Sequence, residues 1–104
     1  MGLYGGGRPS AVFLPAWVYL GGEAIVGNAG NQPATIPAGA TIAEIDAQGG
    51  DVYYALNGGA MSGFVPENGG RILGPLQNLN SIVFNFAVGG TAYIMYFREN
   101  TNRK

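Results

Sequence analysis

The sequence predicts an all-β protein: a small antiparallel β-sandwich, jelly-roll-like, with about eight short strands and a glycine-rich N-terminal arm. Its 19 glycines and 6 prolines divide the 104 residues into short runs. These runs are rich in Val, Ile, Tyr, Phe and Thr and recur about every ten residues, a spacing typical of sandwiches and barrels. Glycine also interrupts every window that could otherwise form an amphipathic helix.

The strands are assigned to the apolar runs between glycines and prolines. We expect them at 11–14, 16–20, 23–26, 41–46, 51–56, 62–65, 81–88 and 91–98. Pro15 lies inside the first apolar run, so this run is an edge strand or contains a bulge. The segment RILGPL (71–76) is a weaker, short strand that ends at Pro75.

The last two strands are apolar on both faces. The Gly89-Gly90 pair lies between them and predicts a tight hairpin, which we expect at the centre of the fold. Alternating residues of three strands form the predicted core, because successive side chains of a strand point to opposite faces. These core residues are Val52, Tyr54, Leu56, Ile82, Phe84, Phe86, Tyr93, Met95 and Phe97.

By composition the chain divides into an N-terminal arm (1–10), a β-sandwich domain (11–98) and a polar C-terminal tail (99–104). The arm is rich in glycine, which loses more backbone freedom on ordering than other residues do. Ordering about eight such residues costs about 8–16 kcal/mol. We therefore expect the arm to order only against a partner, with Leu3, Tyr4 and Arg8 making the contacts.

Charge is scarce and unevenly distributed. Charged residues make up 11% of the chain, compared with about 25% in an average protein, and the net charge is −1. Such a chain tends to associate. Between Pro9 and Gly70 there are five acidic residues and no Lys or Arg. The basic terminal segments of one subunit can therefore pair with the acidic middle segment of another subunit. The basic stripe of a nucleic-acid-binding protein is missing, and we expect no nucleic-acid partner.

Several kinds of chemistry are excluded. The absence of Cys and His removes disulfides, thiolate and imidazole metal sites, and nucleophiles activated by histidine. Glu44 and Asp46 share a strand face, which is ordinary for solvent-exposed acids. We therefore expect no enzymatic activity, catalytic residue, metal or cofactor. No stretch reaches the roughly 20 apolar residues of a membrane helix, so we expect no membrane partner and an N-terminus that is retained.

Four further residues are candidates for partner binding: Trp17, Met61, Phe64 and Arg71. The last three lie in the glycine-rich segment 55–76, which is either an adhesive loop or a set of turns that join strands. The aromatic residues also allow an alternative function, in which they form a platform on which sugars stack. Its candidates are Trp17, Tyr19, Tyr53, Tyr54, Tyr93 and Tyr96.

The chain resembles the small β-rich capsid decoration, or cement, proteins of tailed bacteriophages. The glycine-rich arm and the segments IPAGATIAEID (36–46), GGDVYYALNGG (49–59) and GGTAYIMYFRE (89–99) carry the resemblance. It implies a sandwich on the outer capsid surface of the virion, as a homo-oligomer (dimer or trimer) that bridges and stabilises major capsid proteins. The alternatives are a carbohydrate-binding module and another small virion component, such as a tail or head-fibre subunit.

Overall fold

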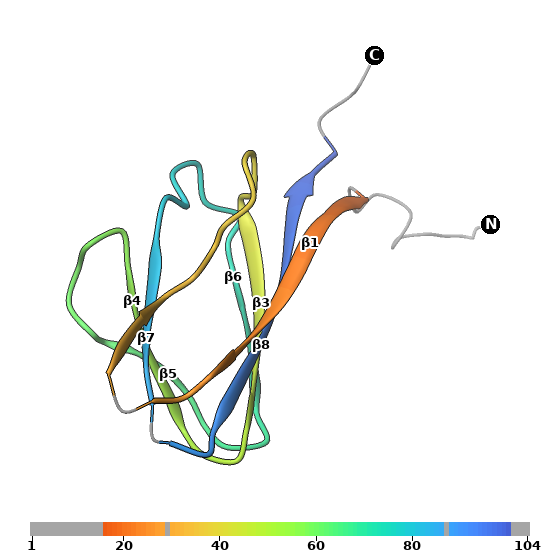
Figure 1. Cartoon of the computed structure of the whole chain (residues 1–104). Coiled ribbons are helices and arrows are strands. Elements are labelled where there is room, and N and C mark those ends of the chain that lie inside the picture. The colour runs from red at the N-terminus through yellow and green to blue at the C-terminus, as the bar shows by residue number, and fades with distance from the viewer. Residues whose placement is uncertain (1–15, 29, 87, 101–104) are drawn as a thin grey trace.

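The computed structural model describes residues 16–28, 30–86 and 88–100. Within these ranges the chain is all-β and has no helix, which confirms the all-β part of the predicted fold class (Figure 1). The strands are β1 (Trp17–Val26), β2 (Asn31–Pro33), β3 (Ile42–Gln48), β4 (Val52–Leu56), β5 (Gly63–Val65), β6 (Gly70–Leu73), β7 (Ile82–Asn85) and β8 (Thr91–Glu99). They form two antiparallel sheets of four strands, in the orders β1-β8-β3-β6 and β2-β7-β4-β5.

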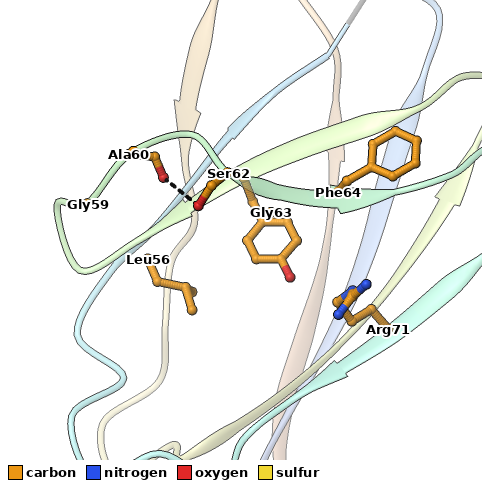
Figure 2. Close-up of a pocket in the computed structure, with 8 residues that line it drawn as sticks. Leu56, Gly59, Ala60, Ser62, Gly63, Phe64 and Arg71 are labelled. Carbon is orange, nitrogen blue, oxygen red and sulfur yellow. Dashed lines mark hydrogen bonds between the residues drawn. The ribbon is translucent and has the colours of Figure 1, made fainter.

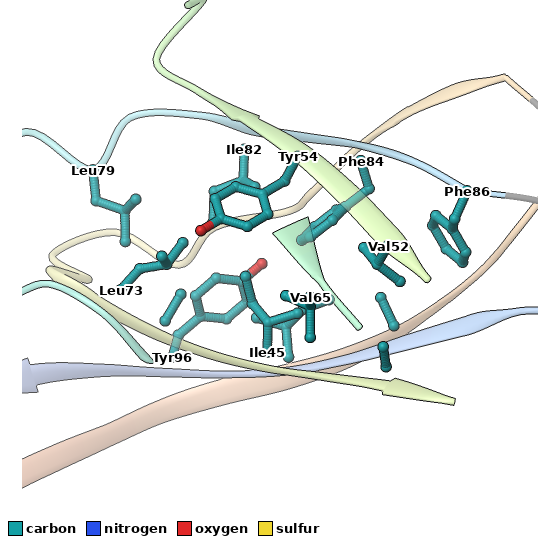
Figure 3. Packing of buried hydrophobic residues seen from close by; sticks show 14 of the residues in the cluster. Ile45, Val52, Tyr54, Val65, Leu73, Leu79, Ile82, Phe84, Phe86 and Tyr96 are labelled. Atoms are coloured by element: carbon teal, nitrogen blue, oxygen red, sulfur yellow. The ribbon is translucent and has the colours of Figure 1, made fainter. Parts of the chain in front are cut away.

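One hydrophobic core lies between the two sheets. Side chains from both sheets meet in it, as Figure 3 shows. The first sheet contributes Ala43, Ile45, Ala47, Leu73, Ala92, Ile94 and Tyr96, and the second contributes Val52, Tyr54, Val65, Ile82 and Phe84. Strict alternation along each strand explains this selection, since every second residue faces the opposite sheet. Among the described residues no polar or charged residue is fully buried.

The two predicted strands 16–20 and 23–26 are one strand. The register between β1 and β8 shifts between Tyr19 and Gly21, so Leu20 is the extra residue of a bulge. Both glycines remain paired with β8, and the pairing continues to Val26. Gly21 has a φ of 144°, which a residue with a β-carbon rarely adopts. Among the described strands β1 lies at the edge of its sheet, as expected for the apolar run that contains Pro15. Pro15 itself and the predicted strand 11–14 lie outside the described residues.

The predicted hairpin across Gly89-Gly90 is wrong. β7 pairs with β2 and β4, whereas β8 pairs with β1 and β3 in the other sheet. The chain therefore crosses between sheets at this turn, where Gly89 has a φ of 99°. A glycine pair permits a sharp turn, but it does not specify which strand the chain joins afterwards.

Part of the predicted core is wrong because the sequence does not show which face of β8 is buried. Val52, Tyr54, Ile82, Phe84 and Phe86 are buried as predicted, and Leu56 packs against the core while partly exposed. The prediction fails on β8, where Tyr93 and Met95 are exposed and Phe97 is half-buried. Ala92, Ile94 and Tyr96 face the core instead. Both faces of β8 are apolar, so the alternation cannot say which of them is buried.

The segment 55–76 contains two short strands joined by turns. β5 and β6 lie where the weaker apolar runs were noted, although β6 begins one residue earlier, at Gly70. This outcome matches the interpretation as strand-joining turns. β2 was not predicted, because its sequence, Asn-Gln-Pro, carries no β-branched or aromatic residue.

A single asparagine fixes the connection between β4 and β5, residues 57–62. Asn57 adopts a φ of 52°. Its Oδ1 accepts hydrogen bonds from the backbone N–H groups of Asn80 (2.8 Å) and Ser81 (3.1 Å), and its Nδ2 donates to the carbonyl of Asn78 (2.7 Å). Its own backbone N–H donates to the carbonyl of Ser81 at 2.9 Å. These bonds hold the 57–62 connection against residues 78–81.

We expect Asn57→Ala to lower the free energy of unfolding by about 2–3 kcal/mol. The variant loses three side-chain hydrogen bonds and places alanine at a positive φ that asparagine tolerates better. Chemical denaturation measures this loss. Asn57→Gly is the matched control, because it keeps the backbone conformation accessible and removes only the bonds, so its loss should be smaller. An Asn57→Ala variant as stable as the wild type would contradict the assignment.

The buried hydroxyl group of Tyr96 forms a hydrogen bond with the carboxylate of Glu23. The Tyr96 hydroxyl donates to Glu23 Oε2 at 2.6 Å, and the same oxygen accepts from the backbone N–H of Thr35 at 2.9 Å. Burial, reinforced by the bond to Glu23 and by its negative charge, raises the pKa of Tyr96 far above its ordinary value of 10.0. The fold therefore stabilises the neutral phenol.

The raised pKa of Tyr96 makes the stability of the fold sensitive to alkaline pH. Tyr96 in the unfolded chain ionises near its ordinary pKa of 10.0, whereas the folded form keeps its proton. Its contribution to stability is therefore complete below that pH and is lost as the pH rises above it, at up to about 1.4 kcal/mol per pH unit. Tyr96→Phe should flatten the decline, and the exposed Tyr93→Phe should not. Denaturation at several alkaline pH values tests this; equal slopes in both variants would rule it out.

Candidate functional site

The outer face of the β1-β8-β3-β6 sheet carries a row of large apolar side chains. We call this surface the aromatic face and define it by Trp17 and Tyr19 on β1 and Tyr93, Met95 and Phe97 on β8. Four of these side chains are exposed, from 41% for Trp17 to 58% for Tyr19, and Phe97 is half-buried. Neighbouring strands bring them side by side, because Tyr19 pairs directly with Phe97.

Phe97 is the centre of this surface. Its ring centroid lies 5.6 Å from that of Trp17, with the planes tilted by 49°, and 5.7 Å from that of Tyr19 in an edge-on arrangement at 62°. On its other side Phe97 pairs with Ile42 of β3. Ile42 is fully buried although it does not belong to the cluster between the sheets. The aromatic face thus contains a small hydrophobic cluster of its own.

The absence of a side chain at Gly22 leaves room for the Tyr19 hydroxyl on β1. A β-carbon on Gly22 would lie 3.1 Å from the Tyr19 hydroxyl oxygen and 2.9 Å from the carbonyl oxygen of Ile94. Only a residue without a side chain leaves this space to Tyr19. The glycine pair that seemed to end a strand therefore serves the packing of the aromatic face.

Three carboxylates accompany the aromatic rings. Glu44 pairs with Met95, Asp46 with Tyr93 and Glu99 with Trp17, so all three lie on the strand faces that carry the rings. The prediction that Glu44 and Asp46 share one face is confirmed. Along the described parts of β1, β8, β3 and β6, no Lys or Arg occupies this outer face. The surface is therefore aromatic and acidic, and it suits an apolar partner with basic groups.

A pocket opens elsewhere on the molecule, between β4, the 57–62 connection, β5 and β6 (Figure 2). Its volume is about 400 Å³. It is lined by Tyr54, Leu56, Gly59, Ala60, Ser62, Gly63, Phe64 and Arg71. On β5, Gly63 pairs with Tyr54, and a β-carbon on Gly63 would lie inside the Tyr54 ring. The glycine thus lets the tyrosine ring lie flat over the β5 backbone.

The predicted partner-binding residues fall into separate groups. Phe64 and Arg71 both line the pocket, and the exposed Met61 lies in the 57–62 connection beside it. Trp17 lies apart from them, on the aromatic face. Leu3, Tyr4 and Arg8 lie outside the described residues.

The six aromatic candidates for a sugar platform do not share a surface. Trp17, Tyr19 and Tyr93 lie on the aromatic face. Tyr53 lies on the outer face of the second sheet, 5.2 Å from the Phe64 ring, while Tyr54 and Tyr96 face the core. Met95 and Phe97 were not predicted as surface residues, and Tyr54 was not predicted to line a pocket. The apolar character of both β8 faces was the one signal that these positions could be exposed.

Comparisons with protein-family models, with curated protein sequences and with solved structures found no match. In the described part of the chain no helix is long and apolar enough to cross a membrane. The same residues contain no cluster of three or more Asp and Glu side chains able to hold a metal ion. The aromatic face and the pocket are therefore the features of the described residues from which a function is inferred.

We expect Gly63→Ala to destabilise the protein by about 1–3 kcal/mol, because the new methyl group must displace the Tyr54 ring from a packed position. Thermal or chemical unfolding measures the loss. Gly30→Ala is the matched control, since its β-carbon would make only an ordinary contact of 3.5 Å with Asn28 Oδ1. Equal losses in the two variants would show that the ring does not depend on Gly63.

Proposed function

We propose that this protein is a non-enzymatic structural subunit of a virion, a cement or decoration protein. It binds the outer capsid surface and bridges and stabilises major capsid proteins. The observation that carries the proposal is the aromatic face. Four of its five side chains are exposed, and aromatic residues and methionine are the types enriched in protein–protein interfaces. A protein partner that covers this face removes the exposed rings from water.

The strand pairing supports a jelly-roll sandwich as the architecture. The antiparallel pairs β1 with β8, β2 with β7, β3 with β6 and β4 with β5 are those of one long hairpin, whose first half pairs with its second half. The added pairs β3 with β8 and β4 with β7 roll that hairpin into two sheets. Jelly rolls of eight strands serve in viral capsid and lectin domains.

Charge supports the choice of a protein partner over nucleic acid. The aromatic face carries Glu44, Asp46 and Glu99 and no cation among its described residues. Phosphates would be repelled there. A shell protein that offers apolar side chains with surrounding Lys or Arg would be attracted. The low charge content of the chain, 11%, fits a subunit that is surrounded by other protein.

The N-terminal arm is the second element of the proposal. Leu3 and Tyr4 provide apolar anchors, and Arg8 provides a cation between glycine-rich and proline-containing stretches. We propose that this arm crosses a junction between shell proteins as a strap, and that the subunits form a dimer or trimer.

A carbohydrate-binding module is the second candidate, because Trp17, Tyr19 and Tyr93 are exposed beside carboxylates. The tilt of 49° and 62° between neighbouring rings disfavours it, since a sugar ring stacks on an open, flat aromatic face. A third candidate is a tail or head-fibre subunit. Open polymers or large rings of the purified chain would favour this third candidate over a dimer or trimer.

Substitution of the aromatic face should weaken capsid binding. We expect the double variant Trp17→Ser, Tyr93→Ser to bind capsids of its native source at least about tenfold more weakly, because a truncated aromatic anchor costs more than about 1 kcal/mol. Cosedimentation with the capsid, in fixed ratio to one major shell protein, measures this. Val88→Ser is the control, since Val88 is 72% exposed and lies off the aromatic face. Equal binding of both variants would overturn the proposal, and glycan binding lost with Trp17→Ala would favour the carbohydrate module.

Deletion of residues 1–8 separates the strap from the domain. We expect the shortened chain to lose capsid binding while its thermal unfolding stays nearly unchanged, because the proposed contacts of Leu3, Tyr4 and Arg8 are with a shell protein and not with the domain. Calorimetry and the same cosedimentation assay provide the two measurements. Full capsid binding by the shortened chain would refute the strap and leave the aromatic face as the binding element.

A further inference from the structure

The pocket beside β5 has a chemistry that the capsid proposal does not use. None of its eight lining residues is acidic, whereas one is a cation, Arg71, and two carry hydroxyl groups, Tyr54 and Ser62. It is therefore rich in hydrogen-bond donors and free of carboxylates. The aromatic face, with its three carboxylates, has the opposite character.

The Tyr54 hydroxyl is the first hydrogen-bond donor available in the pocket. Tyr54 is 5% exposed, yet its hydroxyl has no hydrogen-bond partner in the described part of the chain. Within the described ranges the only buried side-chain polar atom without a partner is Thr41 Oγ1. The Tyr54 hydroxyl oxygen therefore reaches solvent, whereas the Tyr96 hydroxyl in the same core donates to Glu23. Because Tyr54 lines the pocket, its hydroxyl is free to donate a hydrogen bond to a ligand there.

The Arg71 guanidinium is the second hydrogen-bond donor available in the pocket. It pairs with the core-facing Ile45 on β3, so it lies on the inner side of the edge strand β6 and contributes to the pocket. Within the described ranges its guanidinium makes no hydrogen bond or ion pair. Asp46, a nearby carboxylate on β3, lies against Gly70 on the opposite face. Figure 2 shows the Arg71 side chain extending toward the β5 side of the pocket, below Phe64.

We propose that this pocket binds the carboxylate of a small ligand or of an acidic side chain. The carboxylate accepts hydrogen bonds from the Arg71 guanidinium and the Tyr54 hydroxyl, which are donors that pair well with an ionised oxygen. The body of the ligand contacts the apolar side chains of Leu56, Ala60 and Phe64. A volume of about 400 Å³ lies in the range of small-molecule sites and holds a group the size of one hexose or one amino acid.

Two sources can supply this carboxylate: a uronic acid or an acidic residue of a protein. Titration with D-glucuronate and with N-acetyl-glutamate amide, followed by NMR shifts and calorimetry, distinguishes them. D-glucose and N-acetyl-glutamine amide are the neutral controls of matched shape. We expect at least one carboxylate to bind and both neutral probes to fail. The stronger of the two carboxylates identifies the source.

Two variants test the assigned residues. Arg71→Gln and Tyr54→Phe should each weaken carboxylate binding at least about tenfold, and Tyr54→Phe keeps the ring that packs on Gly63. Arg98→Gln is the control, because Arg98 is an exposed cation that does not line the pocket. The proposal is overturned if neither carboxylate binds, if the neutral probes bind equally well, or if Arg98→Gln has the same effect as Arg71→Gln. These assays need no capsid, so their outcome is independent of the proposed function.

Discussion

The central position of β8 determines most of this structure. β8 lies between β1 and β3 and is apolar on both faces. One face, with Ala92, Ile94 and Tyr96, closes the core against the second sheet. The other face has no second layer over it among the described residues, so its rings are left to solvent. The aromatic face is thus a direct consequence of placing a two-sided apolar strand where the described residues form two sheets.

Glycine allows large side chains to pack where strands leave little room. Gly22 makes space for the Tyr19 hydroxyl, and Gly63 for the Tyr54 ring. In both cases the glycine lies within a strand, where it ordinarily weakens the sheet. The gain is the position of the aromatic neighbour, one on the aromatic face and one in the pocket. Both candidate surfaces therefore depend on glycines that, in the sequence, look like turn residues.

Sequence patterns predicted what depends on local alternation. β3 and β4 were located because Gly49-Gly50 separates their apolar runs, and the core residues Val52 and Tyr54 of β4 followed from the period of two. Patterns failed where the answer depends on tertiary pairing. The partner of β7 is β4 rather than β8, and no local signal distinguishes the two. Phe64 and Arg71 were predicted as partner-binding residues and both line the pocket. The place of the Tyr54 hydroxyl at this pocket is a property of the folded surroundings alone.

The aromatic face and the pocket can act separately, because they are built from different strands and opposite charges. The face belongs to β1 and β8 with carboxylates of β3 and β8, whereas the pocket belongs to β4, β5, β6 and the 57–62 connection. They share no residue, and substitutions at sites without common partners have nearly additive effects. A partner on the aromatic face therefore leaves Arg71 unpaired. We therefore expect the proposed carboxylate site in the pocket to remain accessible when a partner covers the rings.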